Sequence, residues 1–166
     1  MNFLTSITID TLSVKIRKYS KVKLNIKSKS FSFSNKNQEK LKLNSKSRLN
    51  IDSNTINIEL GETSLTDALV KCDSLSLKMF NKSNSQIEGN ISNLNANLVN
   101  SNNFEGKKLT VKSCQVSTSE SSDFSIHVVE SITIDTSGSI DVYIYDNPAI
   151  TLNKFTDQAK LHKSEL

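Results

Sequence analysis

The feature that most constrains this chain is a recurring pair of apolar residues at positions i and i+2. Nine such pairs occur along the 166 residues, and successive pairs begin 15 to 23 residues apart, with a mean near 18. They are Ile7/Ile9, Val22/Leu24, Leu41/Leu43, Ile56/Ile58, Leu75/Leu77, Leu94/Ala96, Leu109/Val111, Ile132/Ile134 and Ile150/Leu152. Such alternation indicates half-buried strands, and a regular period indicates a repeat architecture. We therefore expect a stack of similar units.

Polar residues at a fixed distance from these pairs predict the corners between strands. Six residues beyond the start of each pair the chain has a polar residue or glycine: Ser13, Ser28, Ser47, Glu62, Asn81, Asn100, Gln115, Gly138 and Thr156. Ser and Asn side chains bond to nearby backbone, and Asn and Gly tolerate left-handed conformations. In the stretch SITIDTSGSIDVYIYDNPAITL we expect ITI, IDVYI and ITL as sides, with TSGS and YDNP as the corners between them.

A unit of this size cannot exclude water from its apolar side chains alone, so the units must stack. Placed about 4.8 Å from a copy of itself, each unit pairs its backbone with the neighbour and covers the core. The expected fold is all-β, a right-handed parallel β-helix (β-solenoid) of about nine short coils. We expect one domain over residues 1–166, with lysine-rich coils in 1–60, more acidic coils in 61–153 and a polar tail or end cap in 154–166.

Three other architectures were weighed. An antiparallel sandwich or barrel also has short alternating strands, but four glycines and one proline are few for tight hairpins. A left-handed hexapeptide helix requires a strict six-residue recurrence that the chain does not keep. A helical solenoid requires long helical periodicity, whereas only SLTDALVKC (64–72) and FTDQAKLHK (155–163) are compatible with a turn or two of helix.

The composition agrees with a thin core along the whole chain. Hydrophobic residues make up 36 %, while 27 Ser and 19 Asn account for about a quarter of the chain. The net charge of +4 is uneven, because residues 1–60 hold 12 Lys/Arg against 4 Asp/Glu and residues 61–166 hold 9 against 13. A basic half attracts polyanions. Two Arg and no Trp are a poor set for reading or stacking bases, so we expect no nucleic-acid partner.

Cysteine usage and the ends of the chain exclude further classes. Cys72 and Cys114 have neither CxxC spacing nor a nearby His, so we expect no metal and no cofactor. Free buried thiols are the favoured state, and a disulfide between the two remains open. The chain shows no signal peptide and no run of eighteen apolar residues, so no membrane span is expected.

The residues from about Leu94 onward resemble those of a known family. They include Ser137-Gly138-Ser139, then Ile140-Asp141-Val142-Tyr143, then Asn147-Pro148. This order resembles the putative auto-transporter adhesin, head GIN domain family, whose members repeat a short strand, a Ser/Gly corner and another strand. The resemblance implies a right-handed β-helix, export to a bacterial envelope or surface, and an adhesive role.

One candidate ligand site lies in IDVYI. If Ile140, Val142 and Ile144 point inward, then Asp141, Tyr143 and Tyr145 share the outer face. A carboxylate beside two aromatic rings is typical of a carbohydrate-binding strip. The competing interpretation is a tyrosine pair that covers its neighbours on a solvated sheet.

A second candidate site is a row of basic residues at alternate positions. It begins with Lys15 and Arg17, continues with Lys21 and Lys23, and extends through Lys27, Lys29, Lys40 and Lys42. If successive coils place them side by side, this face would bind a polyanion such as an acidic glycan. The competing interpretation is a set of solvated lysines that keep a sheet protein from sticking to others.

Catalytic chemistry has little support in the sequence. Asp123, Asp135, Asp141 and Asp146 form a candidate acid/base set for polysaccharide cleavage, although a solvated surface explains them as well. His127 and His162 are 35 residues apart, and no triad or metal site can be built around either.

These observations predict a non-enzymatic β-helix of the cell envelope or the extracellular space that serves as an adhesin-like binding or structural module. The expected partners are carbohydrate or another surface component. A self-assembling scaffold that polymerises end to end is the main alternative, because open coil ends offer unpaired backbone. A polysaccharide-active enzyme is the third.

Overall fold

The chain forms one stack of parallel strands in a computed structural model that describes residues 7–17, 22–36 and 46–165. No helix occurs in these ranges. The ten strands are β1 (Ile7–Arg17), β2 (Val22–Lys36), β3 (Lys46–Gly61), β4 (Leu65–Phe80), β5 (Asn84–Val99), β6 (Asn103–Glu120), β7 (Asp123–Gly138), β8 (Asp141–Tyr145), β9 (Ala149–Asp157) and β10 (Lys160–Ser164). All pair in parallel in one sheet, in the order β1-β2-β3-β4-β5-β6-β7-β8-β10, with β9 on β7.

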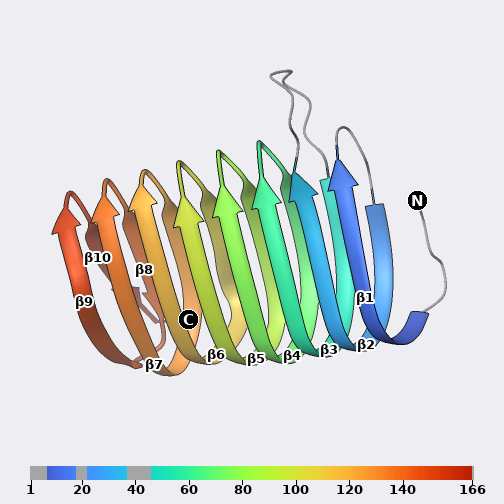
Figure 1. The fold of residues 1–166 in the computed structure, drawn as a ribbon. Coiled ribbons are helices and arrows are strands. Elements are labelled where there is room, and N and C mark those ends of the chain that lie inside the picture. Colours follow the sequence, from blue (N-terminus) through green and yellow to red (C-terminus); the bar gives the residue numbers. More distant parts are fainter. Residues whose placement is uncertain (1–6, 18–21, 37–45, 166) are drawn as a thin grey trace.

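The sheet winds into a right-handed β-solenoid (Figure 1). The predicted class is therefore confirmed, but the solenoid has about seven turns and not nine. One inward column of ladder partners contains one residue from each coil: Leu12, Phe31, Ile56, Leu75, Leu94, Cys114, Ile132 and Ile150. The pairs Val22/Leu24 and Leu109/Val111 lie elsewhere on their coils, so counting every apolar pair gave too many coils. Leu41 and Leu43 fall outside the described residues.

Each coil has two unlike corners. One is a bend, which lies inside a continuous strand up to β7 and becomes a break between β8 and β9, and the other is a turn in which residues adopt positive φ. Four predicted corner positions, Glu62, Asn81, Asn100 and Gly138, lie in such turns. The others lie within strands: Ser13, Ser28, Ser47, Gln115 and Thr156. The turn has a residue at positive φ from the β3/β4 turn onward, whereas at the bend corner only Gly89 and Asp146 do so among the described residues, so only the turn leaves a regular signature in the sequence.

The two segments that were compatible with helix are strands. Residues 65–72 belong to β4, and residues 155–163 contribute to β9 and β10. In β4, Ala68 and Val70 point inward while Leu69 is 51 % exposed. Ladder partners on both sides of β4 satisfy its backbone and override the weak helical propensity.

The core is a thin layer between the two sides of each coil. Alternate residues are almost completely buried, and like side chains stack over like, as in the Phe104 and Phe124 rings, whose centroids are 5.0 Å apart. Cys114 fills a place in the inward column between Leu94 and Ile132. At the turns the interior is polar: the buried Asn102 side chain accepts from Ser83 Oγ at 2.8 Å and donates to Val99 O at 2.7 Å.

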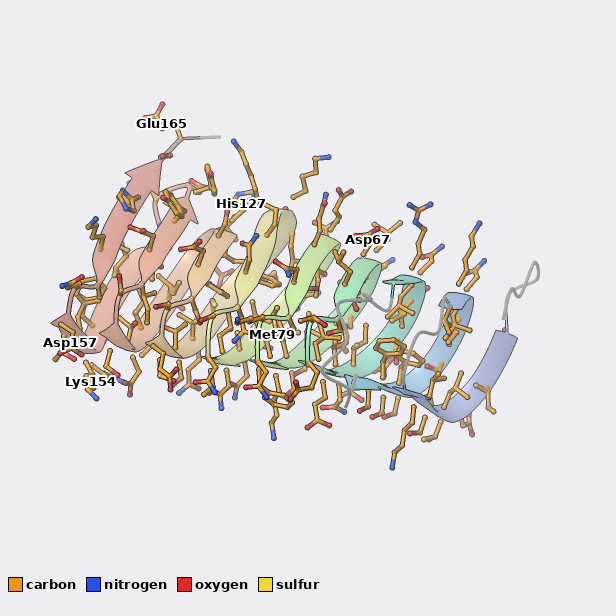
Figure 2. All side chains as sticks on the ribbon, turned by 90° about the horizontal axis from the view of Figure 1, so that it is seen from above. Asp67, Met79, His127, Lys154, Asp157 and Glu165 are labelled. Atoms are coloured by element: carbon orange, nitrogen blue, oxygen red, sulfur yellow. The ribbon has the colours of Figure 1, made fainter. Side chains whose placement is uncertain are left out.

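The solenoid presents two flat outer surfaces. We call face A the outer side of the first half of each coil, which includes β8, β10 and residues 22–25, 46–50, 65–70, 84–88, 103–108 and 123–128. We call face B the outer side of the second half, which includes β9 and residues 11–17, 30–36, 55–61, 74–80, 93–99, 113–120 and 131–138. Figure 2 shows Asp67 and His127 on face A, Lys154 on face B and Met79 between them.

Candidate functional site

The predicted strip of Asp141, Tyr143 and Tyr145 lies on face A. The three residues occupy alternate positions of β8, and their side chains point outward. Their inward neighbours, Val142 and Ile144, are completely buried. The 19-residue step to the next coil then sets β10 directly beside β8, with His162 as the ladder partner of Tyr143.

His162 holds two residues of the strip. Its Nε2 lies 2.8 Å from Asp141 Oδ1, and its ring stacks on Tyr143 with a centroid distance of 4.5 Å and an interplanar angle of 13°. One face of the Tyr143 ring is therefore occupied by the chain itself. The period of the repeat pointed to a partner on the next coil, but its variation from 15 to 23 residues did not fix which residue that partner is.

Two residues from the preceding coils complete the group. His127 on β7 is the ladder partner of Tyr145, and its Nε2 lies 3.3 Å from Asp146 Oδ2. Lys107 lies in the part of β6 where the ladder shifts register. Its Nζ lies 4.4 Å from the centroid of the Tyr145 ring. We call the residues Asp141, Tyr143, Tyr145, His127, His162 and Lys107 the aromatic cluster.

The basic residues do not form one row. Lys15 lies on face B and pairs with Ser34, whereas Lys23 lies on face A and pairs with Arg48. The side chain of Arg17 and all of Lys21, Lys40 and Lys42 fall outside the described residues. Lys29, near the bend, pairs with Asp10 at 3.2 Å. Lys23 is thus the candidate cation that has a second cationic residue, Arg48, beside it on the same face.

A groove of about 590 Å³ lies over β2 to β5 on face A. Two outward rows of side chains line it: Lys23, Arg48, Asp67 and Gln86, and beside them Asn25, Asn50, Leu69 and Glu88. The sequence reasoning singled out Lys23 alone, because the other members come together through the ladder.

The candidate acids divide between the faces. Asp135 is exposed on face B, so it cannot act together with Asp141 on face A. Asp123 and Asp141 are ladder partners at the start of β7 and β8. Within the described ranges no group of three or more His, Cys, Asp or Glu could hold a metal ion.

Cys72 and Cys114 are free thiols, and burial lowers their reactivity by keeping them protonated. Burial raises the pKa of the Cys72 thiol to about 12, with a smaller contribution from the charge of Asp73. Burial also raises the pKa of Cys114 far above its usual value. Because the thiolate is the nucleophile and the metal ligand, neither cysteine suits a catalytic role.

The fold and the site define a β-solenoid that displays charged and aromatic side chains on one flat face. The chain matches the family described as "Putative auto-transporter adhesin, head GIN domain" over residues 5–148, and it belongs to that family. Membership points to an adhesin-like module at the cell surface or in the extracellular space. No curated protein and no solved structure matches the chain. The described residues hold no helix of the length and hydropathy that a membrane crossing requires.

Proposed function

We propose that this protein is a non-enzymatic, adhesin-like module of the cell envelope, at the periplasm or the outer surface, that binds carbohydrate through face A. The observation that carries the proposal is the aromatic cluster. Two tyrosines and a carboxylate point outward from one five-residue strand, and cationic or imidazole side chains flank them.

The contacts within the cluster indicate how a sugar would bind. His162 and Lys107 each lie against one ring face, so a sugar packs on the remaining ring surfaces and edges. Asp141 Oδ1 contacts His162 Nε2, whereas Asp141 Oδ2 has no hydrogen-bond partner in the part of the chain that the structure describes. Asp141 Oδ2 is therefore available to accept a hydrogen bond from a sugar hydroxyl. Burial of an aromatic ring under an apolar sugar face supplies the remaining affinity.

A glycan array followed by titration of the retained glycans tests this proposal. Tyr143→Ala and Tyr145→Ala should each weaken binding by about three- to tenfold, the effect of one aromatic contact. Thr133→Ala on face B is the matched control and should bind as the parent protein does. Unchanged binding in both tyrosine variants would refute the assignment of the strip.

The same experiment separates binding from cleavage. A bound glycan should be recovered with its length unchanged after long incubation. Shortened glycan that disappears with Asp123→Asn or Asp141→Asn would instead make the ladder pair Asp123 and Asp141 a hydrolytic site, since paired carboxylates are what glycoside hydrolysis requires.

End-to-end self-association is a second candidate, favoured by the open last coil. Leu152 on β9 is 48 % exposed, whereas its ladder partner Ile134 is completely buried. A second copy stacked on β9 would cover Leu152 and pair the edge of β9 that has no ladder partner among the described residues. The bulge at Asn153 and the exposed Lys154 hinder such pairing, so we expect weak, concentration-dependent association.

Analytical ultracentrifugation over a wide concentration range tests self-association. Leu152→Lys should abolish any oligomer, and Thr151→Lys on the outward side of the same strand should have less effect. A single monomeric species at all concentrations would eliminate this candidate and leave carbohydrate binding untouched.

A further inference from the structure

The groove over β2 to β5 carries an inference that is independent of the aromatic cluster. It lies on face A toward the N-terminal end, is open to solvent along its length, has a volume of about 590 Å³ and shares no residue with the cluster. Its volume falls within the range of small-molecule sites. The charge of its lining side chains changes from positive over β2 and β3 to negative over β4 and β5. This change of charge restricts the kind of ligand that the groove can bind.

The end of the groove over β2 and β3 is cationic. Lys23 and Arg48 are ladder partners, so their backbones are about 4.8 Å apart and both side chains project from face A. Lys23 has no ion pair within the described residues. The Arg48 side chain is 66 % exposed, and its guanidinium is 3.9 Å from Asp67, which leaves most of its donors open. This end suits a carboxylate, which a guanidinium binds through two parallel hydrogen bonds.

The opposite end accepts no second anion. Asp67 and Glu88 line the groove over β4 and β5, and Glu88 already accepts from Lys108 Nζ at 3.3 Å and from Gln86 Nε2 at 3.0 Å. A polyanion that extended along the groove from β2 and β3 would be repelled by the carboxylates of Asp67 and Glu88 over β4 and β5. The ligand therefore has one anionic group, at the Lys23 and Arg48 end.

An exposed leucine lies next to the cationic end. Leu69 is 51 % exposed, and its ladder partners are Asn50 and Glu88. Covering a leucine removes apolar surface from water, so a methyl or another small apolar group of the ligand is expected to contact Leu69. The amides of Asn25, Asn50 and Gln86 surround these positions and can bond to hydroxyl or amide groups.

The floor of the groove argues for a sugar over a peptide strand. The backbone of β3 and β4 is paired in the ladder on both sides, so no free N–H or C=O is available for strand addition. Recognition must come from side chains. A compact ligand with hydroxyl groups on several sides suits an open groove lined by amides.

We propose that this groove binds an acidic sugar that carries one carboxylate and an N-acyl group. The carboxylate contacts Arg48 and Lys23, the acyl methyl packs on Leu69, and the sugar hydroxyls bond to the surrounding amides.

Titration of three soluble sugars, followed by calorimetry and by chemical-shift changes in the full chain, tests the inference. N-acetylneuraminic acid carries both groups, glucuronic acid only the carboxylate, and N-acetylglucosamine only the acyl group. The first should bind most tightly. Arg48→Gln should weaken its binding about tenfold, and Leu69→Ser should weaken it about fivefold.

Lys78→Gln on face B is the matched control for loss of a cation and should leave binding unchanged. Melting temperatures of all variants should stay close to that of the parent, because the substituted side chains are exposed. Equal binding of N-acetylglucosamine, no binding of any sugar at about 10 mM, or binding that survives both groove variants would overturn the inference. Ligand-induced chemical-shift changes should fall on the groove residues of β2 to β5 and not on β8 and β10, so failure here is distinguishable from failure of the aromatic cluster.

Discussion

Face A and face B share one backbone ladder but present different chemistry. On face B one column holds only uncharged polar side chains, Ser76, Asn95, Gln115 and Thr133, and the neighbouring column mixes Asn97 and Ser117 with the charged residues Glu59, Lys78, Asp135 and Lys154. On face A, the same coils carry the aromatic cluster and the charged groove. The ladder stabilises both faces through the backbone and the inward residues. Outward residues are therefore free to specialise, and in this chain face A is the specialised one.

Side chains join neighbouring coils on both faces. Face A residues meet partners one or two coils away, including His162 with Asp141 and Lys107 with Tyr145. On face B the 3.1 Å hydrogen bond from Ser131 Oγ to Ser113 Oγ likewise joins two adjacent coils. Four predictions test the comparison of the two faces. They begin with the buried core that both faces share and end with exposed side chains.

The largest effect is expected from Leu94→Asp. Leu94 is 2 % exposed in the inward column that both faces cover. The substitution loses about 1.5 to 3 kcal/mol of apolar burial and adds the larger cost of an unpaired buried charge. Denaturant titration should show loss of the folded state. Thr133→Asp, on the outer side of face B, should change stability by less than about 0.5 kcal/mol; equal effects would contradict the inward and outward assignment.

Gly138→Ala should have the next largest effect, because the chain passes from face B to face A at this turn. Gly138 has φ +116°, and an added Cβ would lie 2.3 Å from Glu120 O. We expect a loss of about 1 to 3 kcal/mol in the same titration. The neighbouring Ser139→Ala should be nearly silent, and a wild-type melting temperature for Gly138→Ala would show that the turn is not constrained.

The two thiols report on the interior at alkaline pH. In the folded state the pKa of Cys72 is about 12, compared with 9.0 for an exposed thiol, and that of Cys114 is also raised. The folded state thus retains protons that the unfolded state releases, so stability is complete below pH 9 and declines from 9 toward 12. Cys72→Ala should make this decline shallower than in the parent. Rapid alkylation of Cys114 in the native protein at pH 8 would contradict its burial.

The smallest effect is expected from His162→Ala on face A. The His162 and Asp141 side chains are 40 % and 35 % exposed, and exposed pairs of this kind contribute less than about 1 kcal/mol. A double-mutant cycle with Tyr143→Ala measures the stacking contribution. Ser131→Ala, which removes the hydrogen bond to Ser113 on face B, serves as the comparison. A coupling energy of zero would mean that the ring contact stabilises neither residue.

The sequence predicted the architecture because period-two alternation reports directly on burial. Ile140, Val142 and Ile144 are buried, and Asp141, Tyr143 and Tyr145 point outward, as alternation requires. The number of coils was wrong because apolar pairs occur on both halves of a coil, and alternation alone does not tell which half a pair belongs to.

The partners within the sites were less predictable for a related reason. His162 lies beside Tyr143 because exactly one coil separates them, and a mean spacing near 18 does not fix that register. Lys107 reaches Tyr145 past an intervening coil, from a place where β6 shifts register. The groove depends on Leu69, which looked like part of a short helix in isolation. Each of these arrangements is a property of neighbouring coils together and not of any local segment.

The even spacing of the coils has a consequence for the size of the molecule. Residues 84–102 span one complete coil of 19 residues, because Asn84 is the ladder partner of Asn103, the first residue of the next coil. Duplicating that segment would lengthen the rod by about 4.8 Å while leaving the chemistry of each end intact. The distance between the groove and the aromatic cluster is therefore adjustable in whole steps of one coil.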